Sequence, residues 1–367
     1  MRIAIAHPFS WPEVRRGGER YADDLITYLR GAGHVVDSIG GTGGVASRHE
    51  SAQGADIRLP NLRNVRRGRV QLREIETFGA RALPTLARRR VDVVHAMVPT
   101  VALAAKAAGQ RTVLTLLGHP TPELLAQKPV QRRVLAIAAR VLDGITALSE
   151  VVADDVEAAF GRRPTVVPPG VWVDRFTAQP RSAEPVILFA SAMAPEKGVD
   201  VLLRAFARVR SVRPDARLCL SGPGDPAWAF DKTREVIDAH LDHIDIVGVG
   251  DPADLPGRYA RAHVTVLPSR NEAFGLVLAE SLAAGTPVVG STSGGAAEIV
   301  AHDVGRAVTH GDDRELADAL LAVLDLAARP ETAGACRARA RLWDWAETVG
   351  PLHEAVYRTV GPRKRPV

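Results

Sequence analysis

The chain has 367 residues, of which 46% are hydrophobic and 24% are charged, a composition typical of a folded globular protein. This length is enough for two domains of ordinary size. With only two cysteines, Cys219 and Cys336, a disulfide framework and a cysteine-based zinc site are excluded. No apolar run reaches the roughly 18 residues that span a bilayer, and residues 1–7 enter a strand without a signal-peptide layout, so we expect a cytoplasmic protein.

The net charge of +5 is unevenly distributed, with +8 on residues 1–180 and −3 on residues 181–367. One basic stretch stands out, formed by Arg58, Arg63, Arg66, Arg67, Arg69 and Arg73. It predicts either a peripheral contact with an anionic membrane at its inner face, an anionic acceptor, or simply a solvated basic surface. Few aromatic residues interleave with these arginines and no nucleic-acid motif is present, so nucleic acid is not an expected partner.

Short apolar strands alternate with amphipathic helices in the first half of the chain. Strands are predicted at 2–6, 35–39, 91–96, 111–116, 144–148 and 165–167. Helices are predicted at 18–31, 73–90, 101–108, 129–142 and 149–160. We assign residues 1–175 to an N-terminal domain.

A polar, proline-containing stretch follows at 175–185, and residues 176–184 are assigned as a linker. Alternation then resumes through residues 185–344, the predicted C-terminal domain. Its strands are predicted at 186–190, 216–221, 244–247, 264–268 and 287–290, and its helices at 199–211, 231–240, 255–262, 275–284 and 314–341. A last helix at about 345–360 is expected to pack back on the N-terminal domain.

Regular strand–helix alternation is typical of parallel α/β sheets. The fold class is therefore predicted as α/β, with two Rossmann-like, doubly wound parallel-sheet domains facing across a cleft. Ligands of such sheets bind beyond the carboxyl ends of the strands, so loops that follow strands should carry the functional residues.

Residues 271–290 form the most informative segment. Glu272 and Glu280 lie eight residues apart around the pair Phe274-Gly275, and Gly275 opens an apolar helix-like run. A helix N-terminus offers free N–H groups and partial positive charge to phosphate, while carboxylates accept hydrogen bonds from sugar hydroxyls. The segment therefore predicts a site for a sugar linked to a diphosphate.

Other motifs also follow predicted strands. Gly17-Gly18 opens the first helix and permits close approach of the backbone to a phosphate or sugar; a loop that needs only flexible φ angles is the alternative. Lys197 lies at a helix start where its ammonium can meet a diphosphate; a plain surface turn is the alternative. Gly222 allows close approach to a phosphate or base, or forms an ordinary turn, and Val249-Gly250 offers backbone groups to a nucleobase. The G-x-G-x-x-G fingerprint is incomplete, so a dehydrogenase is rejected.

The histidines receive different interpretations. His119 follows the fourth strand and either contacts a donor sugar or phosphate or is incidental. His7 and His95 are predicted to be structural or to support residues that contact the ligand. A polar cluster is spaced for a loop rather than for one coordination sphere, so no metal site is predicted; it consists of His240, Asp242, His243 and Asp245. The glycines of 40–44 lack the Lys-Ser/Thr of a P-loop, and no G-x-S-x-G elbow supports a nucleophilic triad.

These motifs together resemble the retaining GT4-type glycosyltransferases of the GT-B fold. The resemblance rests on 271–290, 195–198, Gly17-Gly18 and 168–176, and covers nearly the whole chain. It implies a UDP- or GDP-sugar donor on the C-terminal domain and a hydroxyl acceptor on the N-terminal domain. The acceptor would be an envelope glycolipid, a polysaccharide or a small secondary metabolite. The resemblance also implies retention of the anomeric configuration, with no cofactor and no metal.

The resemblance assigns roles to individual residues. Glu272 would contact the donor sugar, Lys197 the diphosphate and Glu280 the ribose hydroxyls, and His119 joins Glu272 and Lys197 in the predicted catalytic set. The remaining residues predicted to bind the donor are Gly17, Gly18, Ser191, Gly222, Val249, Gly250, Phe274, Gly275 and Leu276. Phe274, Gly275 and Leu276 would present backbone N–H groups, and the two N-terminal glycines would close on the donor phosphate.

The chain departs from the family pattern at three places. Ser191-Ala192 stands where the family has Gly-Arg, Leu117 stands where it has His, and 168–172 varies a linker motif. A nucleotide-sugar-binding protein with weak or no catalysis is therefore an alternative. An epimerase or phosphorylase of the same fold is a further one.

Overall fold

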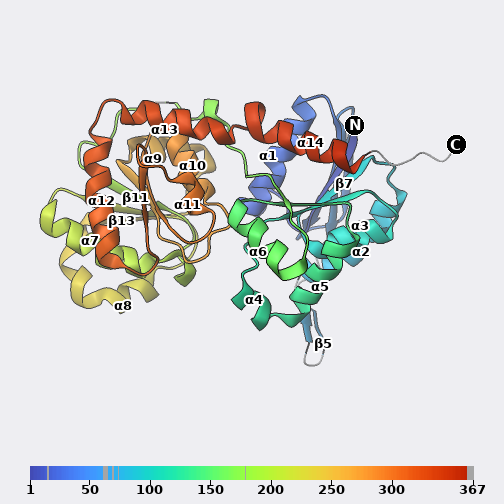
Figure 1. Cartoon of the computed structure of the whole chain (residues 1–367), viewed down its shortest axis with the longest axis horizontal. Coiled ribbons are helices and arrows are strands. Elements are labelled where there is room, and N and C mark those ends of the chain that lie inside the picture. The colour runs from blue at the N-terminus through green and yellow to red at the C-terminus, as the bar shows by residue number, and fades with distance from the viewer. Residues whose placement is uncertain (15, 61–64, 68–69, 73, 178, 362–367) are drawn as a thin grey trace. The chain divides into compact units, whose positions relative to one another are not determined.

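The computed structural model describes residues 1–367 except 15, 61–64, 68–69, 73, 178 and 362–367. The chain divides into two compact units (Figure 1). The N-terminal unit contains Met1–Gly170 and Val349–Val367, and the C-terminal unit contains Val171–Thr348. The boundaries thus fall after Gly170 and Thr348, whereas the sequence analysis places them at 175 and 344.

The N-terminal unit is built on an eight-stranded sheet in the order β10-β9-β8-β7-β1-β2-β4-β3. Its strands are parallel except β3, which pairs antiparallel with β4. The strands are β1 (Arg2–His7), β2 (Val35–Thr42), β3 (Ser47–Ser51), β4 (Gly54–Pro60), β7 (Val93–Ala96), β8 (Thr112–Leu116), β9 (Gly144–Ala147) and β10 (Thr165–Val166). A separate antiparallel pair is formed by β5 (Val65–Arg67) and β6 (Val70–Leu72).

Helices complete this unit: α1 (Gly17–Gly31), α2 (Glu74–Arg88), α3 (Pro99–Ala107), α4 (Pro122–Gln127), α5 (Pro129–Val141), α6 (Glu150–Phe160) and α14 (Gly350–Val360). The sequence analysis missed β3 to β6. β3, with the sequence Ser-Arg-His-Glu-Ser, is exposed along its whole length, so it lacks the apolar residues by which a strand is recognised.

The helix α14 joins the N-terminal unit through buried polar side chains and lies beside α1 (Figure 1). Tyr21 Oη lies 2.8 Å from His353 Nε2, and Tyr357 Oη lies 2.7 Å from His95 Nδ1. Burial lowers the pKa of His353 to about 3 and holds the pKa of His95 well below its ordinary value. His95 is fully buried and has hydrogen-bond partners at both ring nitrogens, Tyr357 and Thr115, which agrees with a structural role.

The C-terminal unit contains a fully parallel six-stranded sheet in the order β13-β12-β11-β14-β15-β16. Its strands are β11 (Val186–Ala190), β12 (Arg217–Ser221), β13 (Ile244–Gly248), β14 (Val264–Leu267), β15 (Val288–Ser291) and β16 (Gly305–Val308). This is the doubly wound order, in which the strands are added outward on one side from β11 and then outward on the other side from β14, so that the strand order reverses between these two strands. That switch point lies between the neighbours β11 and β14, where a ligand site is expected.

The helices of this unit are α7 (Val199–Val212), α8 (Ala227–Ile237), α9 (Leu255–Arg261), α10 (Leu276–Ala283), α11 (Ala296–Ile299), α12 (Asp313–Ala327) and α13 (Thr332–Ala340). One long helix was predicted over 314–341, but two form. Pro330 follows α12 and cannot donate the backbone hydrogen bond that a continuous helix needs.

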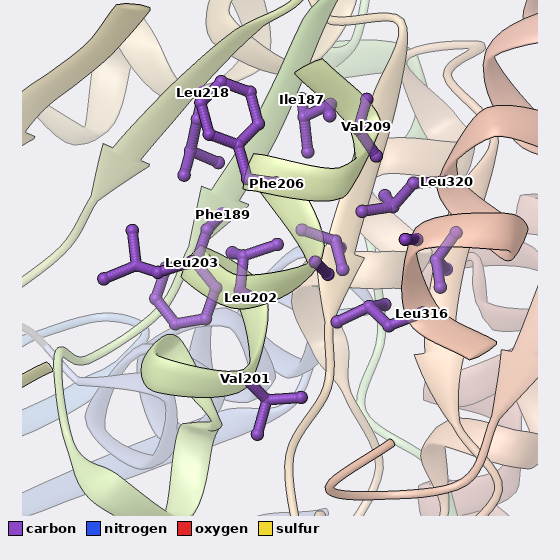
Figure 2. Close-up of a cluster of buried hydrophobic side chains, with 14 of the residues drawn as sticks. Ile187, Phe189, Val201, Leu202, Leu203, Phe206, Val209, Leu218, Leu316 and Leu320 are labelled. Atoms are coloured by element: carbon purple, nitrogen blue, oxygen red, sulfur yellow. The ribbon is translucent and has the colours of Figure 1, made fainter. Parts of the chain in front are cut away.

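The core of the C-terminal unit lies between α7, the sheet and α12 (Figure 2). The apolar residues of α7 recur at helical spacing, so that Leu202, Phe206 and Val209 face the same side and are fully buried. They pack with Phe189 of β11 and Leu320 of α12. Each large buried side chain contributes about 1.5–3 kcal/mol. This core fixes the strand ends from which the functional loops extend.

Candidate functional site

Lys197 and Glu272 meet at the switch point of the C-terminal sheet. Lys197 ends the 3-10 turn Pro195–Lys197 after β11, and Glu272 follows β14. The Lys197 ammonium donates to Glu272 Oε2 over 2.7 Å, and the two side chains are 24% and 17% exposed. The structure therefore brings together two residues that were both predicted to be catalytic.

The loop that carries Glu272 is fixed on three sides. The Arg270 N–H donates to the Glu196 carbonyl over 2.9 Å, which ties this loop to the Lys197 turn. The Glu272 carbonyl accepts the Gly295 N–H over 2.9 Å. Phe274 is buried and meets Trp343 edge-on, with 5.7 Å between ring centroids. These contacts hold the carboxylate in place before any ligand binds.

The helix α10 begins immediately after this loop. Its N-cap is Gly275, which has a φ of +96° and no capping side chain among the described residues. The first N–H groups of a helix have no partner within it, so here they are offered beside Glu272 at the positive end of the helix dipole. Phe274, Gly275 and Leu276 thus lie where a backbone cradle for phosphate is expected; their contact with a donor stays a prediction.

Glu280 lies on the second turn of α10 and is only 2% exposed. Its Oε2 accepts a hydrogen bond of 2.8 Å from Tyr259 of α9, a partner that the sequence analysis did not identify. This partner orients the carboxylate. The predicted contact with ribose hydroxyls stays a prediction.

Loops after three strands converge beside these residues. The Gly222 N–H donates to the Gly248 carbonyl over 2.9 Å. A Cβ on Gly222 would stand 2.0 Å from the Ser191 carbonyl oxygen, so only glycine permits this approach. The neighbouring Val249 side chain is 56% exposed. The structure therefore brings Ser191, Gly222 and Gly248 together at the carboxyl ends of β11, β12 and β13, with Val249 next in the chain.

Arg258 joins the same loops from α9. Its Nη1 donates to Ser221 Oγ over 2.8 Å, and its Nη2 lies 2.0 Å from the point where a Cβ on Gly250 would stand. A guanidinium thus lies within the predicted nucleotide loops. The sequence analysis did not assign it, because nothing in its spacing connects it to them. Arg270 was also missed, although it immediately precedes the 271–290 segment; its Nε donates to His310 Nε2 over 3.1 Å.

In the N-terminal unit, Gly17 and Gly18 begin α1 directly after the β1 loop. No side chain among the described residues caps this helix. The space beside Gly17 is open, whereas a Cβ on Gly18 would stand 3.0 Å from Leu117 Cδ1 and 3.9 Å from His7 Nε2. Leu117, at the position where the family pattern has histidine, therefore lies against Gly18.

His119 occupies a different environment. Its Nε2 lies 2.7 Å from Asp155 Oδ2 on α6, and its side chain is 6% exposed. Asp155 is a partner for Nε2, whereas Nδ1 is buried and has no hydrogen-bond partner among the described residues. The contact of His119 with a donor stays a prediction. His7 is also buried, with Nδ1 2.8 Å from the Phe9 carbonyl oxygen, and burial lowers its pKa, which agrees with a structural role.

A small hollow opens in the N-terminal unit between the β1 loop, α1 and β2. Its polar lining includes His7, Glu19, Ser38 and Arg58. Arg58 Nη1 donates to Ser38 Oγ over 3.2 Å, and the guanidinium pairs with no carboxylate among the described residues. The hollow thus combines hydroxyl, carboxylate and guanidinium groups that can bind a polar molecule.

The other predictions concern metals and membranes. No group of three His, Cys, Asp or Glu side chains among the described residues is arranged to hold a metal ion. Within the same part of the chain, no helix is both long and apolar enough to cross a membrane. Of the basic stretch, Arg63, Arg69 and Arg73 lie outside the described residues.

Comparison with known proteins defines the class. Residues 171–343 match the sequence model described as "Glycosyl transferases group 1", and residues 15–175 match "Glycosyltransferase Family 4". Two parallel-sheet α/β units with these matches define a glycosyltransferase of the GT-B fold, which confirms the predicted fold class. The chain belongs to the GT4 glycosyltransferases.

Individual relatives support this assignment. The chain is 34% identical to a D-inositol 3-phosphate glycosyltransferase of Thermobispora bispora over 67% of its own length and 64% of that protein. It is 31% identical to a GDP-mannose-dependent alpha-(1-6)-phosphatidylinositol monomannoside mannosyltransferase of Mycolicibacterium smegmatis, covering 66% of this chain and 67% of the relative. The match thus spans less than two thirds of the first of these relatives.

A solved structure supports the fold. A sucrose-phosphate synthase from Thermosynechococcus elongatus has a TM-score of 0.81 at 21% identity, covering 98% of this chain and 99% of the other. At this identity the likeness shows the fold alone.

Proposed function

We propose that the protein transfers a hexosyl group from a UDP- or GDP-sugar to a hydroxyl acceptor, with retention of the anomeric configuration. The observation that carries the proposal is the Lys197–Glu272 pair beside the uncapped N-terminus of α10. It places a cation, a carboxylate and helix N–H groups together, as a sugar joined to a diphosphate requires. The named donor of one relative is GDP-mannose, which supports a nucleotide sugar in general.

The proposed chemistry follows from these charges. The bond between the anomeric carbon and the diphosphate oxygen breaks, and the acceptor oxygen bonds to that carbon on the same face. The proton of the acceptor hydroxyl passes to the leaving diphosphate. Negative charge grows on the diphosphate as the bond breaks, and Lys197 with the α10 N-terminus stabilises it. Glu272 orients the sugar through its hydroxyls.

A nucleotide-sugar screen tests the proposal. UDP- and GDP-sugars are added to the whole chain and the thermal unfolding midpoint is measured. A matching donor at 100 times its Kd adds about 2.7 kcal/mol of stability, which should raise the midpoint by a few degrees. Release of UDP or GDP with an acceptor then demonstrates transfer. The proposal is wrong if no nucleotide sugar shifts the midpoint and none is consumed.

A second candidate, a nucleotide-sugar-binding protein with weak or no catalysis, is favoured by two departures from the family pattern. Leu117 contacts Gly18 where the family pattern has histidine, and Ala192 supplies no cation where that pattern has arginine. Donor binding without transfer across a broad acceptor set would favour this candidate. Gain of turnover in Ala192→Arg would then identify the missing cation as the cause.

We propose that Arg258 replaces part of the missing charge. Its guanidinium reaches Ser221, and the adjacent Gly222 packs against Ser191, the neighbour of Ala192. A charge-assisted hydrogen bond contributes about 1.5–3 kcal/mol, so Arg258→Gln should weaken binding of the nucleoside diphosphate about 10- to 150-fold by calorimetry. The control is Arg261→Gln on the same helix, whose side chain donates to Gln179 rather than to the loops after the strands. Equal affinities of the two variants would contradict this role.

We also propose a peripheral contact with anionic lipid through the N-terminal unit. The helix α5 exposes an apolar stripe at helical spacing, with Val130 72%, Ile137 51% and Val141 41% exposed. Arg133 and Arg140 lie beside this stripe, an arrangement typical of helices that bind at a membrane surface.

A vesicle assay tests this contact. Sedimentation with phosphatidylserine vesicles should fall at least about tenfold in Val130→Glu/Ile137→Glu, because two apolar side chains no longer enter the lipid. Binding should also weaken at high salt. Val212→Glu in the C-terminal unit, where Val212 is 63% exposed, is the matched control. Equal binding of all three proteins would exclude α5 as the lipid contact.

A further inference from the structure

A second cavity lies at the amino ends of the strands of the C-terminal sheet, whereas Lys197 and Glu272 lie at the carboxyl ends. It has a volume of about 300 Å³ and is lined in part by Ala260 and Gly285, which precede β14 and β15, so it lies where the strands begin. Gly285 follows the C-terminal end of α10, whereas Gly275 lies at its other end. The eight residues of α10 span about 12 Å, so this cavity is separate from the proposed donor site.

Three arginines line this cavity: Arg181, Arg329 and Arg337. No carboxylate is among its described lining residues. Arg181 Nη2 donates to the Gly285 carbonyl over 3.2 Å, and Arg337 Nη1 lies 2.5 Å from the point where a Cβ on Gly285 would stand. Two guanidinium groups therefore lie against one residue. No carboxylate among the described lining residues offsets their repulsion.

A purely structural explanation accounts for only one of the three. Arg181 also donates to the Ala327 carbonyl, so it caps the C-terminal ends of both α10 and α12. Burial, with the nearby Arg337 contributing, lowers the pKa of Arg181. Arg329 and Arg337 cap no helix: their side chains make no hydrogen bond to any described residue. Arg329 is exposed to solvent and Arg337 is half-buried, so both guanidinium groups are available to a ligand in the cavity.

The helix α13 adds a further donor to the same cavity. Ala333, on its first turn, lines the cavity, and its N–H has no acceptor among the described residues. An N–H group at a helix start carries partial positive charge and binds phosphate oxygens. Guanidinium groups offer a planar set of donors that matches phosphate geometry. Three arginines and a helix N-terminus thus converge on a space at the lower end of the range for small-molecule sites.

We propose that this cavity binds a small phosphate monoester, of the size of a phosphorylated sugar, held by Arg329, Arg337 and the α13 N-terminus. The site is independent of the proposed transfer reaction, since it shares no residue with the loops around Lys197. Its ligand is recognised by the phosphate group, and the volume of the cavity leaves room for the attached sugar.

Calorimetric titration of the whole chain at constant ionic strength tests this site. The probes are glucose 6-phosphate, glucose and inorganic phosphate. We expect glucose 6-phosphate to bind wild-type protein and the double variant Arg329→Gln/Arg337→Gln to bind it at least tenfold more weakly. Arg314→Gln, at an exposed arginine at the other end of α12, removes one positive charge outside the cavity, as Arg329→Gln alone removes one inside it, and should leave the affinity unchanged. Lys197→Ala should also bind normally, because it alters only the proposed donor site.

Several results would overturn the proposal. Wild-type affinity in the double variant, or loss of binding in Lys197→Ala, would place the phosphate elsewhere. Equal binding of glucose would exclude phosphate recognition, and tighter binding of inorganic phosphate would exclude an ester as the ligand. Arg329→Gln alone alters an exposed side chain, so it tests the site even where the double variant fails to fold.

Discussion

Glu272→Gln should lower kcat/KM for sugar transfer about 100- to 1,000-fold, the range found when one preorganised polar group is removed from a catalytic site. Its affinity for the free nucleoside diphosphate should be retained or become tighter. The reason is the 2.7 Å pair with Lys197: a neutral amide in place of the Glu272 carboxylate no longer neutralises the ammonium that the diphosphate needs. Initial rates and calorimetry measure the two quantities separately.

Glu196→Gln is the matched control for this substitution. Glu196 lies beside Lys197 in the chain but is exposed, and only its backbone carbonyl contacts the Glu272 loop. Its activity should remain within about threefold of wild type, since surface substitutions usually change free energies by less than about 0.5 kcal/mol. If Glu272→Gln lost diphosphate binding in parallel with activity, Glu272 would only hold the loop in shape. If Glu272→Gln transferred sugar at one third of the wild-type rate, the assigned role of Glu272 in transfer would also be rejected.

Gly294→Ala should destabilise the C-terminal unit by about 2–4 kcal/mol and abolish most of the activity. Gly294 has a φ of +78°, and a Cβ at this position would stand 2.2 Å from the Glu272 carbonyl oxygen. The methyl group therefore adds a backbone collision to the cost of a left-handed conformation. Because Glu272 is the residue displaced, loss of stability and loss of activity share one cause.

Gly311→Ala separates these two contributions. Gly311 has a similar φ of +89°, but a Cβ there meets nothing within 4 Å. This variant should lose only about 1–2 kcal/mol and keep its activity. Four of the five tryptophans lie in the C-terminal unit, so urea unfolding followed by tryptophan fluorescence reports mainly on that unit. Similar losses of stability in the two variants would show that the collision with Glu272 is relieved at little cost.

The sequence predicted the fold class because its strands and helices differ so clearly in hydrophobic period. The strand β11 is apolar throughout and α7 carries apolar residues at helical spacing, which are the two patterns that periodicity detects. The hairpin of β3 and β4 escaped prediction because β3 is polar and exposed. The division into α12 and α13 was missed because the apolar pattern continues on both sides of Pro330.

The candidate site was predicted only in part. Strand ends identified the loops of Lys197 and Glu272, yet nothing in the sequence shows that side chains 75 positions apart form an ion pair. Tyr259 and Arg258 reach Glu280 and Ser221 from α9, a helix that carried no motif. Such contacts depend on how a helix packs beside its sheet, which local patterns do not encode.

The position of α14 has a consequence for the order in which the chain acquires its structure during synthesis. Residues 349–360 complete the N-terminal unit, but a ribosome makes them only after all of 171–348. At about 5–20 residues per second, this interval lasts roughly 9–36 s. Throughout that time Tyr21 and His95 lack the partners that α14 supplies, His353 and Tyr357. The N-terminal unit, although translated first, is therefore the last to complete its fold. The surface that α14 covers stays exposed on the nascent chain until then.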